Sequence, residues 1–170
     1  PRGRPWVREE AFVPVEAAVA KATNAYAELR TLTKEAATLG SISSLLGWDQ
    51  ETYMPVNAGA HRGDQLALMA TLVHERVTSP RVGELIAACE SDKALMSDPE
   101  QAANIREMRR DYDKATKLPT ELVAELARVG SLAQEAWKDA RKASDFPKFA
   151  PILSQLIDLI RTKAQCLGIP

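Results

Sequence analysis

Apolar residues recur every three or four positions along most of this chain, and this spacing restricts its fold more than any other feature. From Val15 to about Leu39, the spacing places a single apolar stripe along one face of a helix. A second regular seam follows Pro119, with alternating steps of four and three residues. Its members are Leu122, Leu126, Val129, Ala133, Ala136 and Ala140. No segment alternates with period two for long enough to predict a strand, so the sequence predicts an all-α protein.

Helix start signals divide the chain into five to six helices. Ser79 and Pro80 offer an N-cap residue followed by a proline at the first helical position, where its missing N–H costs nothing. Asp98 and Pro99 repeat this signal, and Gln101 adds the glutamine of a capping box. The expected helices run from Val15 to about Trp48, about Ala60 to Val77, Pro80 to about Leu95, Asp98 to about Ala115, Pro119 to about Ala140, and Asp145 to Leu167. The second should bury Leu66, Met69, Val73 and Val77, and the last should become regular near Pro151.

Composition narrows the class of protein. Lys and Arg together number 22 and Asp and Glu 23, so the net charge of -1 provides no field to gather nucleic acid or anionic lipid. No apolar run approaches the roughly 20 residues of a membrane span. The basic start has no apolar core of a secretory signal. We therefore expect a cytoplasmic protein with no nucleic-acid or membrane partner, in which Cys89 and Cys166 are small buried residues rather than a disulfide.

The segment beginning at His74 looks like the start of a zinc-binding motif. In HExxH, two histidines one helical turn apart bind zinc and the glutamate activates water. Here His74 and Glu75 fit, but the fifth position is Thr78, and the other histidine, His61, lies thirteen residues earlier. We therefore expect His74 to have a surface or capping role.

A charge-rich run from Arg106 to Lys114 could be interpreted as an anion site. However, Arg109 and Asp113 stand four residues apart, and Glu107 and Arg110 three apart. These spacings predict charges that pair with one another on one helix. The alternative is a structural contact with another part of a larger protein.

The segment Gly47–Pro55 concentrates polar and aromatic side chains where a helix meets the loop Met54–Gly59. Trp48 and Tyr53 could be packing anchors or ligand contacts. Asp49 and Glu51 could act as an acid and a base only if burial separated their pKa values. The local pattern leaves these alternatives open.

Taken in order, several segments resemble the carboxypeptidase Taq family of zinc metallocarboxypeptidases. The matching segments are Leu45–Pro55, Arg62, Gln65–Ala67, Leu72–Arg76, Ala102–Tyr112, Lys117–Pro119, Ala133–Trp137 and Asp145–Pro151. Several blocks in the family's order are more specific than any one of them. The likeness identifies residues 15–170 as a helical N-terminal domain and leaves residues 1–14 outside as a tail.

The resemblance implies a largely helical metallocarboxypeptidase, expected to be a homodimer, with a deep groove between two helical halves. In that family, a HExxH helix and a later glutamate hold one zinc ion, and the HExxH glutamate activates the metal-bound water that attacks the last peptide bond. None of these residues can be carried over to this chain. We therefore expect zinc only in the complete enzyme, no metal ligand or catalytic residue here, and a missing C-terminal catalytic part as the main partner.

The resemblance places Trp48, Asp49 and Gln50 nearest the cleft that binds the peptide substrate. In the alternative interpretation, Trp48 is a core anchor, and Asp49 and Gln50 fix the turn from helix to loop. Three hypotheses remain for the whole chain. It is a piece of the enzyme that forms groove wall without catalysis, an independent helical module that binds a peptide or protein, or a structural or dimerising domain. In isolation it should expose apolar surface and self-associate.

Overall fold

The computed structural model of the protein describes residues 15–169, with side chains described from Asn24 onward. This range contains seven α-helices, one short 3-10 helix and no strand, so the all-α prediction is confirmed. The elements are α1 (Val15–Thr52), η1 (Val56–Ala58), α2 (Gly59–Val77), α3 (Pro80–Glu90), α4 (Lys93–Ser97), α5 (Pro99–Ala115), α6 (Thr120–Ala143) and α7 (Phe146–Leu167). The tail expected at residues 1–14 lies outside the described residues.

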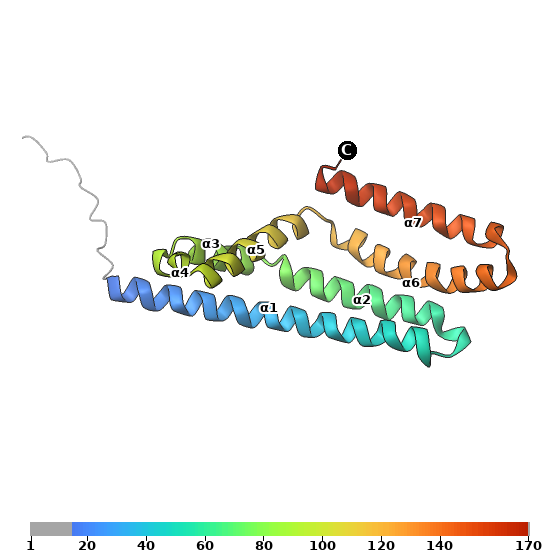
Figure 1. Cartoon of the computed structure of the whole chain (residues 1–170), viewed down its shortest axis with the longest axis horizontal. Coiled ribbons are helices and arrows are strands. Elements are labelled where there is room, and N and C mark those ends of the chain that lie inside the picture. The colour runs from blue at the N-terminus through green and yellow to red at the C-terminus, as the bar shows by residue number, and fades with distance from the viewer. Residues whose placement is uncertain (1–14, 170) are drawn as a thin grey trace, which may run out of the picture.

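Four long helices form a series in which each packs mainly against the next. α2 returns along the C-terminal half of α1, α6 lies against α2, and α7 returns along α6 (Figure 1). The shorter helices α3, α4 and α5 gather beside the N-terminal half of α1. The molecule is therefore elongated, with α7 as the outermost helix along one edge. None of the helices in the described range is long and apolar enough to cross a membrane.

The tightest core lies where α1, α3 and α5 meet. Leu29, Ile86, Cys89 and Ile105 have no exposed surface there. Ala25, Val82 and Leu85 complete the buried cluster, and Tyr112 and Met108 pack against its edge. Burying one large aliphatic side chain stabilises a fold by about 1.5–3 kcal/mol. This end of the molecule therefore has a core of its own.

The start of α5 has the predicted Asp98 cap but not the predicted capping box, because the Asp98 backbone N–H donates to the Leu95 carbonyl and Gln101 Nε2 donates to the Asp98 side chain instead. The Asp98 carboxylate accepts hydrogen bonds from the backbone N–H groups of Glu100, at 2.9 Å, and Gln101, at 3.0 Å. Ser79 and Asp145 also occupy N-cap positions, before α3 and α7, but neither side chain makes a capping hydrogen bond.

The largest differences from the predicted helix boundaries lie at the end of α3 and at the start of α7. The helix expected from Pro80 to Leu95 stops at Glu90, because the Asp92 side chain caps a new short helix by accepting from the N–H of Ala94 at 2.8 Å. The last helix is regular from Phe146 onward, and Pro151 lies inside it. A proline there removes one backbone hydrogen bond close to the helix start, and packing on α6 keeps the helix continuous.

α2 buries a different set of residues from the one predicted. Leu66, Met69, Val73 and Val77 are half-buried. The buried residues are Arg62, Gly63, Ala67 and His74. The reason is that α2 lies between α1 and α6, so two of its faces are covered instead of one apolar stripe. At Gly63, an added Cβ would lie 3.6 Å from atoms of Arg128 and Leu132 on α6, which shows how closely the two helices approach.

Large apolar side chains remain exposed on the long helices and on the short segments that follow α1 and α7. They are Ile42, Leu45, Trp48, Tyr53, Val56, Leu68, Leu72, Trp137, Phe146, Ile157, Ile160 and Ile169. No residue of α7 is buried. Both cysteines are free thiols; Cys89 is buried and Cys166 is half-buried. Burial raises the pKa of the Cys89 thiol, and the nearby charges of Asp92 and Glu90 raise it further.

Candidate functional site

The candidate segment forms the last turn of α1 and its exit into η1. The carbonyl of Asp49 accepts from the N–H groups of both Tyr53, at 3.0 Å, and Met54, at 2.9 Å. Pro55, which follows directly, has no N–H with which to continue a helix. The chain therefore turns at a fixed point, and the side chains just before it are held on rigid helix.

Gln50 is buried between α1 and α6. Its amide nitrogen donates to the Ser131 carbonyl at 3.0 Å and to Glu135 Oε1 at 3.1 Å, and its amide oxygen accepts from Ser131 Oγ at 2.9 Å. A buried polar group left without partners would cost about 1–3 kcal/mol, and here the amide is satisfied. Gln50 therefore joins α1 to a helix more than eighty residues later in the chain.

Asp49 reaches the other neighbouring helix, α2. Its carboxylate pairs with the guanidinium of Arg62, a side chain that is itself buried. The same guanidinium donates to the Leu46 carbonyl and, through Nε, to Gln65 Oε1 at 2.9 Å. Asp49 thus neutralises a buried cation and fixes the α1–α2 hairpin close to its turn.

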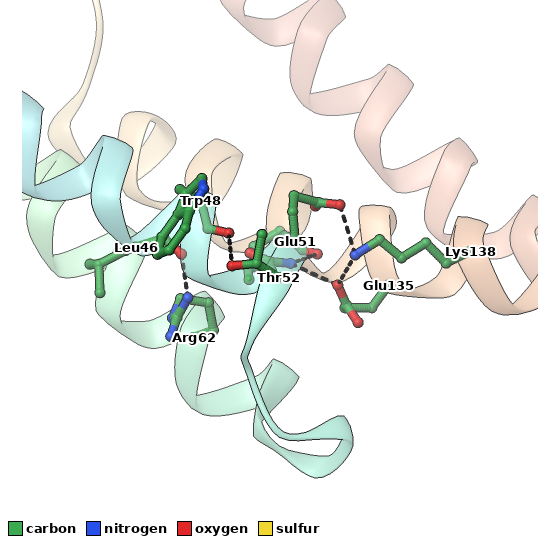
Figure 2. A network of polar contacts seen from close by, with 9 residues as sticks. Leu46, Trp48, Glu51, Thr52, Arg62, Glu135 and Lys138 are labelled. Carbon is green, nitrogen blue, oxygen red and sulfur yellow. Dashed lines mark hydrogen bonds and ion pairs between the residues drawn. The ribbon is translucent and has the colours of Figure 1, made fainter.

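A second polar contact between α1 and α6 lies next to Gln50. Figure 2 shows Lys138 between two carboxylates, at 3.0 Å from both Glu51 and Glu135. Hydrogen bonding to Glu51, together with the hydrogen bond and charge of Glu135, raises the pKa of Lys138. Glu135 also accepts from Gln50, so the two contacts form one continuous network. We call this set, Gln50, Glu51, Ser131, Glu135 and Lys138, the α1–α6 clasp.

Trp48 has a different environment from the two residues that follow it. Its side chain is 57% exposed, and its ring meets Tyr53, which is 76% exposed, edge to face at 5.6 Å between centroids. Such pairs contribute about 0.5–1.5 kcal/mol beyond burial. The packing-anchor interpretation of Trp48 therefore does not hold within the described residues, whereas Asp49 and Gln50 do fix the end of the helix. The groove role predicted for the three residues stays a prediction.

His74 joins α2 to the junction between α5 and α6. Its Nε2 lies 3.1 Å from the carbonyl of Ala115, the last residue of α5, and its Nδ1 lies 3.0 Å from Thr120 Oγ1. A carbonyl can only accept, so Nε2 carries a proton and donates to this terminal carbonyl. The expected capping role is present, but the residue is buried and not on the surface. His61 is exposed at the start of α2.

The charge-rich run on α5 is paired as its spacing predicts. Arg110 contacts Glu107 at 2.9 Å and Arg109 contacts Asp113 at 3.7 Å. Arg109 also pairs with Glu90 of α3 at 2.8 Å, a partner that sequence spacing could not identify. Across the described residues, no three His, Cys, Asp or Glu side chains come together where a metal ion could be held.

The chain is similar in sequence and in structure to known metallopeptidases. A family model described as carboxypeptidase Taq (M32) metallopeptidase matches residues 28–169. Thermostable carboxypeptidase 1 of Thermus thermophilus is 38% identical over 145 residues, which are 84% of this chain and 28% of that protein. The crystal structure of BsuCP superposes with a TM-score of 0.80 at 25% identity, covering 85% of this chain and 29% of that one. The M32 carboxypeptidase of Deinococcus radiodurans R1 gives 0.65 at 36% identity, with the same coverage.

Proposed function

The chain belongs to the carboxypeptidase Taq (M32) metallopeptidase family, and we propose that it forms the N-terminal helical part of a zinc metallocarboxypeptidase that removes C-terminal residues from peptides. The observation that carries this proposal is the match that runs through residues 28–169, almost all of the described chain. The chain spans 28% of the length of the T. thermophilus relative. Zinc, peptide cleavage, a cytoplasmic location and assembly as a homodimer are therefore proposed for the complete protein.

Within that enzyme, we assign this chain a role without catalytic residues. The sequence has only two histidines, and both ring nitrogens of His74 are engaged with Thr120 and Ala115. A bound zinc ion would polarise the scissile carbonyl and activate water, and its ligands are assigned to the remainder of the complete protein.

The chain is proposed to contribute part of the wall of the substrate groove, through the segment Trp48–Gln50. The exposed ring of Trp48, set against Tyr53, offers a flat apolar surface on which a peptide side chain could rest. Asp49 and Gln50 are occupied by contacts with α2 and α6, which support a positioning role for them. In this proposal, the α1–α6 clasp and the Asp49–Arg62 pair hold Trp48 at the edge of the groove.

The test uses the complete polypeptide with the single changes Trp48→Ala, Gln50→Ala and, as a control, Leu68→Ala. Leu68 is about as exposed as Trp48 but lies on α2, outside the segment. We expect Trp48→Ala to lower kcat/KM for release of a C-terminal residue from a peptide with no change in Tm. Gln50→Ala should reduce the stability by about 1–3 kcal/mol because it leaves Ser131 unpaired.

Each result rejects a separate part of the proposal. A wild-type polypeptide that releases no C-terminal amino acid and holds no zinc would reject the enzyme. Normal kinetics for Trp48→Ala, or an equal effect of Leu68→Ala, would reject the groove role and leave the enzyme in place.

A stand-alone module that binds a peptide or another protein is the second candidate, and the exposed pair of Trp48 and Tyr53 favours it. The coding DNA after the codon for Pro170 separates the two candidates. An open frame that encodes HExxH supports the enzyme, whereas an immediate stop codon supports the module.

A further inference from the structure

A cavity of about 220 Å³ lies where the middle of α1 meets the end of α2 and the helices α3 and α5. Figure 1 shows these four helices side by side at this point. The deepest lining residues are buried, and they are Leu29, Val82 and Ile86. The other apolar lining residues are half-buried: Leu32, Val77, Met108, Tyr112 and Ala115. The remaining lining residues are exposed and polar, namely Thr33, Arg76 and Asp111. The cavity therefore has an apolar interior and a charged mouth.

Three polar contacts outside the cavity hold its four helices together. Arg81 of α3 pairs with Glu28 of α1 at 2.7 Å, and Arg109 of α5 pairs with Glu90 of α3 at 2.8 Å. His74 of α2 donates to the last carbonyl of α5 at 3.1 Å. Helices fixed in this way resist the collapse that would fill the space between them. The cavity is therefore preformed, as pockets for small ligands usually are.

The two charged groups at the mouth have hydrogen-bonding capacity left for a ligand. Among the described residues, the Arg76 guanidinium has one ion pair, with Glu35 at 3.5 Å, and it carries five N–H donors. The Asp111 carboxylate has no ion pair in the described part of the chain, unlike Asp113, which pairs with Arg109. A guanidinium binds a carboxylate through two parallel hydrogen bonds, and a carboxylate binds an ammonium group. The mouth therefore suits a ligand that carries both signs of charge.

We propose that this cavity binds a free amino acid with an apolar side chain. The side chain enters the apolar interior, the α-carboxylate binds Arg76, and the α-ammonium group binds Asp111. In a protein core, a cavity of about 150 Å³ is enough to hold benzene. A cavity of about 220 Å³ therefore accommodates one aromatic ring or one branched aliphatic chain.

A zwitterion matches this mouth better than a ligand with a single charge. An amine alone would place its ammonium group beside Arg76, and a carboxylate alone would lie beside Asp111. Either arrangement sets like charges close together, which is unfavourable. An amino acid avoids this cost, because each of its two charges has an opposite partner.

Amino acids of this kind are also what a carboxypeptidase releases from a peptide. The cavity therefore binds molecules of the product class at a place separate from the segment Trp48–Gln50. This link to the reaction rests on the proposed function, whereas the binding itself does not.

The test measures the binding of three probes to the 170-residue chain. They are L-phenylalanine, phenethylamine, which lacks the carboxylate, and 3-phenylpropionate, which lacks the ammonium group. NMR shifts of the Ile86 and Met108 methyl groups, which line the cavity, report where each probe binds and how tightly. L-phenylalanine should shift both methyl groups and bind more tightly than either analogue.

Two charge variants at the mouth should give a crossed pattern. Arg76→Gln should weaken L-phenylalanine and 3-phenylpropionate by about two- to fivefold, the range of an exposed ion pair, and should not weaken phenethylamine. Asp111→Asn should weaken L-phenylalanine and phenethylamine by a similar factor and should not weaken 3-phenylpropionate. The matched controls, Arg110→Gln and Asp113→Asn, remove the same charges from α5 outside the cavity and should change none of the three affinities.

A third variant fills the cavity. Ala115→Leu should abolish the binding of all three probes, because its side chain occupies the apolar interior. Ala87→Leu, at an exposed position of α3 outside the lining, should leave binding unchanged. If Ala115→Leu does not fold, the crossed pattern of the two charge variants decides the question, since both change exposed side chains.

Several results would overturn the proposal. Methyl groups that do not shift with L-phenylalanine up to its solubility limit would show that the cavity takes no amino acid. Charge variants that act like their controls, or that weaken all three probes equally, would exclude recognition of the two charges. Full binding to a folded Ala115→Leu chain would place the probe outside the cavity. No readout uses catalysis, so a complete protein that releases no C-terminal amino acid would count against the proposed function alone.

Discussion

The core formed by α1, α3 and α5 and the apolar face of α7 have the same helical spacing of apolar residues but differ in how completely those residues are buried. Leu29, Ile86 and Ile105 have no exposed surface, whereas no residue of α7 is buried. Both regions are amphipathic helices in sequence, and the difference is the number of neighbours. In the first region three helices surround a common centre, and in the second one helix rests on a single partner. Periodicity therefore identifies the face that should be covered, but not whether this part of the chain covers it.

The sharpest test of this contrast removes the same atoms from the two regions. Ile105→Ala should lower the free energy of unfolding by about 2–5 kcal/mol, because it leaves a cavity in a closed core. Ile157→Ala on α7 should change it by no more than about 0.5 kcal/mol in the 170-residue chain, because the side chain already contacts water. Denaturant unfolding of both variants measures the difference. Equal losses would show that α7 is as well packed as the core.

Adding a methyl group tests how tightly the core is closed. A Cβ at Gly83 would lie 2.6 Å from the Tyr112 hydroxyl oxygen and 2.9 Å from its ring carbon, Cζ. Gly83→Ala should therefore destabilise the chain by about 1–3 kcal/mol. Gly40→Ala is the matched control, since nothing lies within 4 Å of the added atom on α1, and it should stabilise by about 0.5–1 kcal/mol. A Gly83→Ala variant of wild-type Tm would mean that Tyr112 moves aside freely.

The N-termini of α5 and α7 can be compared in the same way, and the expected difference in stability is smaller. Asp98→Ala removes the cap of α5 and should cost about 1 kcal/mol. Asp145→Ala at the start of α7 should cost no more than about 0.5 kcal/mol, because that side chain makes no capping hydrogen bond. Thermal unfolding of the two variants gives the comparison. A larger loss for Asp145→Ala would reveal a capping contact in solution.

The two thiols should differ in how their reactivity depends on pH. The pKa of Cys89 lies above the ordinary value of a thiol, so at a given alkaline pH less of it is thiolate, the form that reacts. The folded state holds this proton more tightly than the unfolded state. Stability from this group is therefore full below pH about 8.5, the unfolded thiol pKa, and falls as pH rises through the folded pKa. Alkylation followed by mass analysis between pH 7 and 10 should label Cys166 first throughout. Preferential labelling of Cys89 would contradict its burial.

Features set by neighbouring residues in the sequence could be predicted, and features set by distant partners could not. The Asp98 cap, the pairing of Arg109 with Asp113 and the seam of α6 depend on spacings of two to four residues, and all are present. The break between α3 and α4 could not be predicted, because it depends on Asp92 capping a new helix. Several polar residues near it could have served as the cap almost equally well. The burial of Arg62 and His74 could not be predicted from one apolar stripe, because α2 has helices on two sides.

The candidate site also combines residues that the sequence identified with partners that it could not identify. The pattern singled out Trp48, Asp49 and Gln50, but it could not separate their surroundings. The partner of Gln50 is Ser131, eighty-one residues away, and only the packing of α1 against α6 brings them together. Lys138, Glu135 and Arg62 were missed for the same reason. An isolated buried glutamine just before a helix end offers no local sign of its partner.

The serial arrangement of the long helices has a consequence for the order in which the molecule opens. Because α7 touches little besides α6, it can detach and reattach without disturbing α1, α2 or the core at the far end. Thermal fluctuations should therefore release the helices from the α7 edge inward, as separate cooperative units of rising free energy. In the 170-residue chain, amide protons of α7 should exchange with solvent fastest, those of α6 and α2 more slowly, and those around Ile105 only on global unfolding. The molecule is therefore expected to open by sub-global unfolding from the α7 edge before it unfolds as a whole.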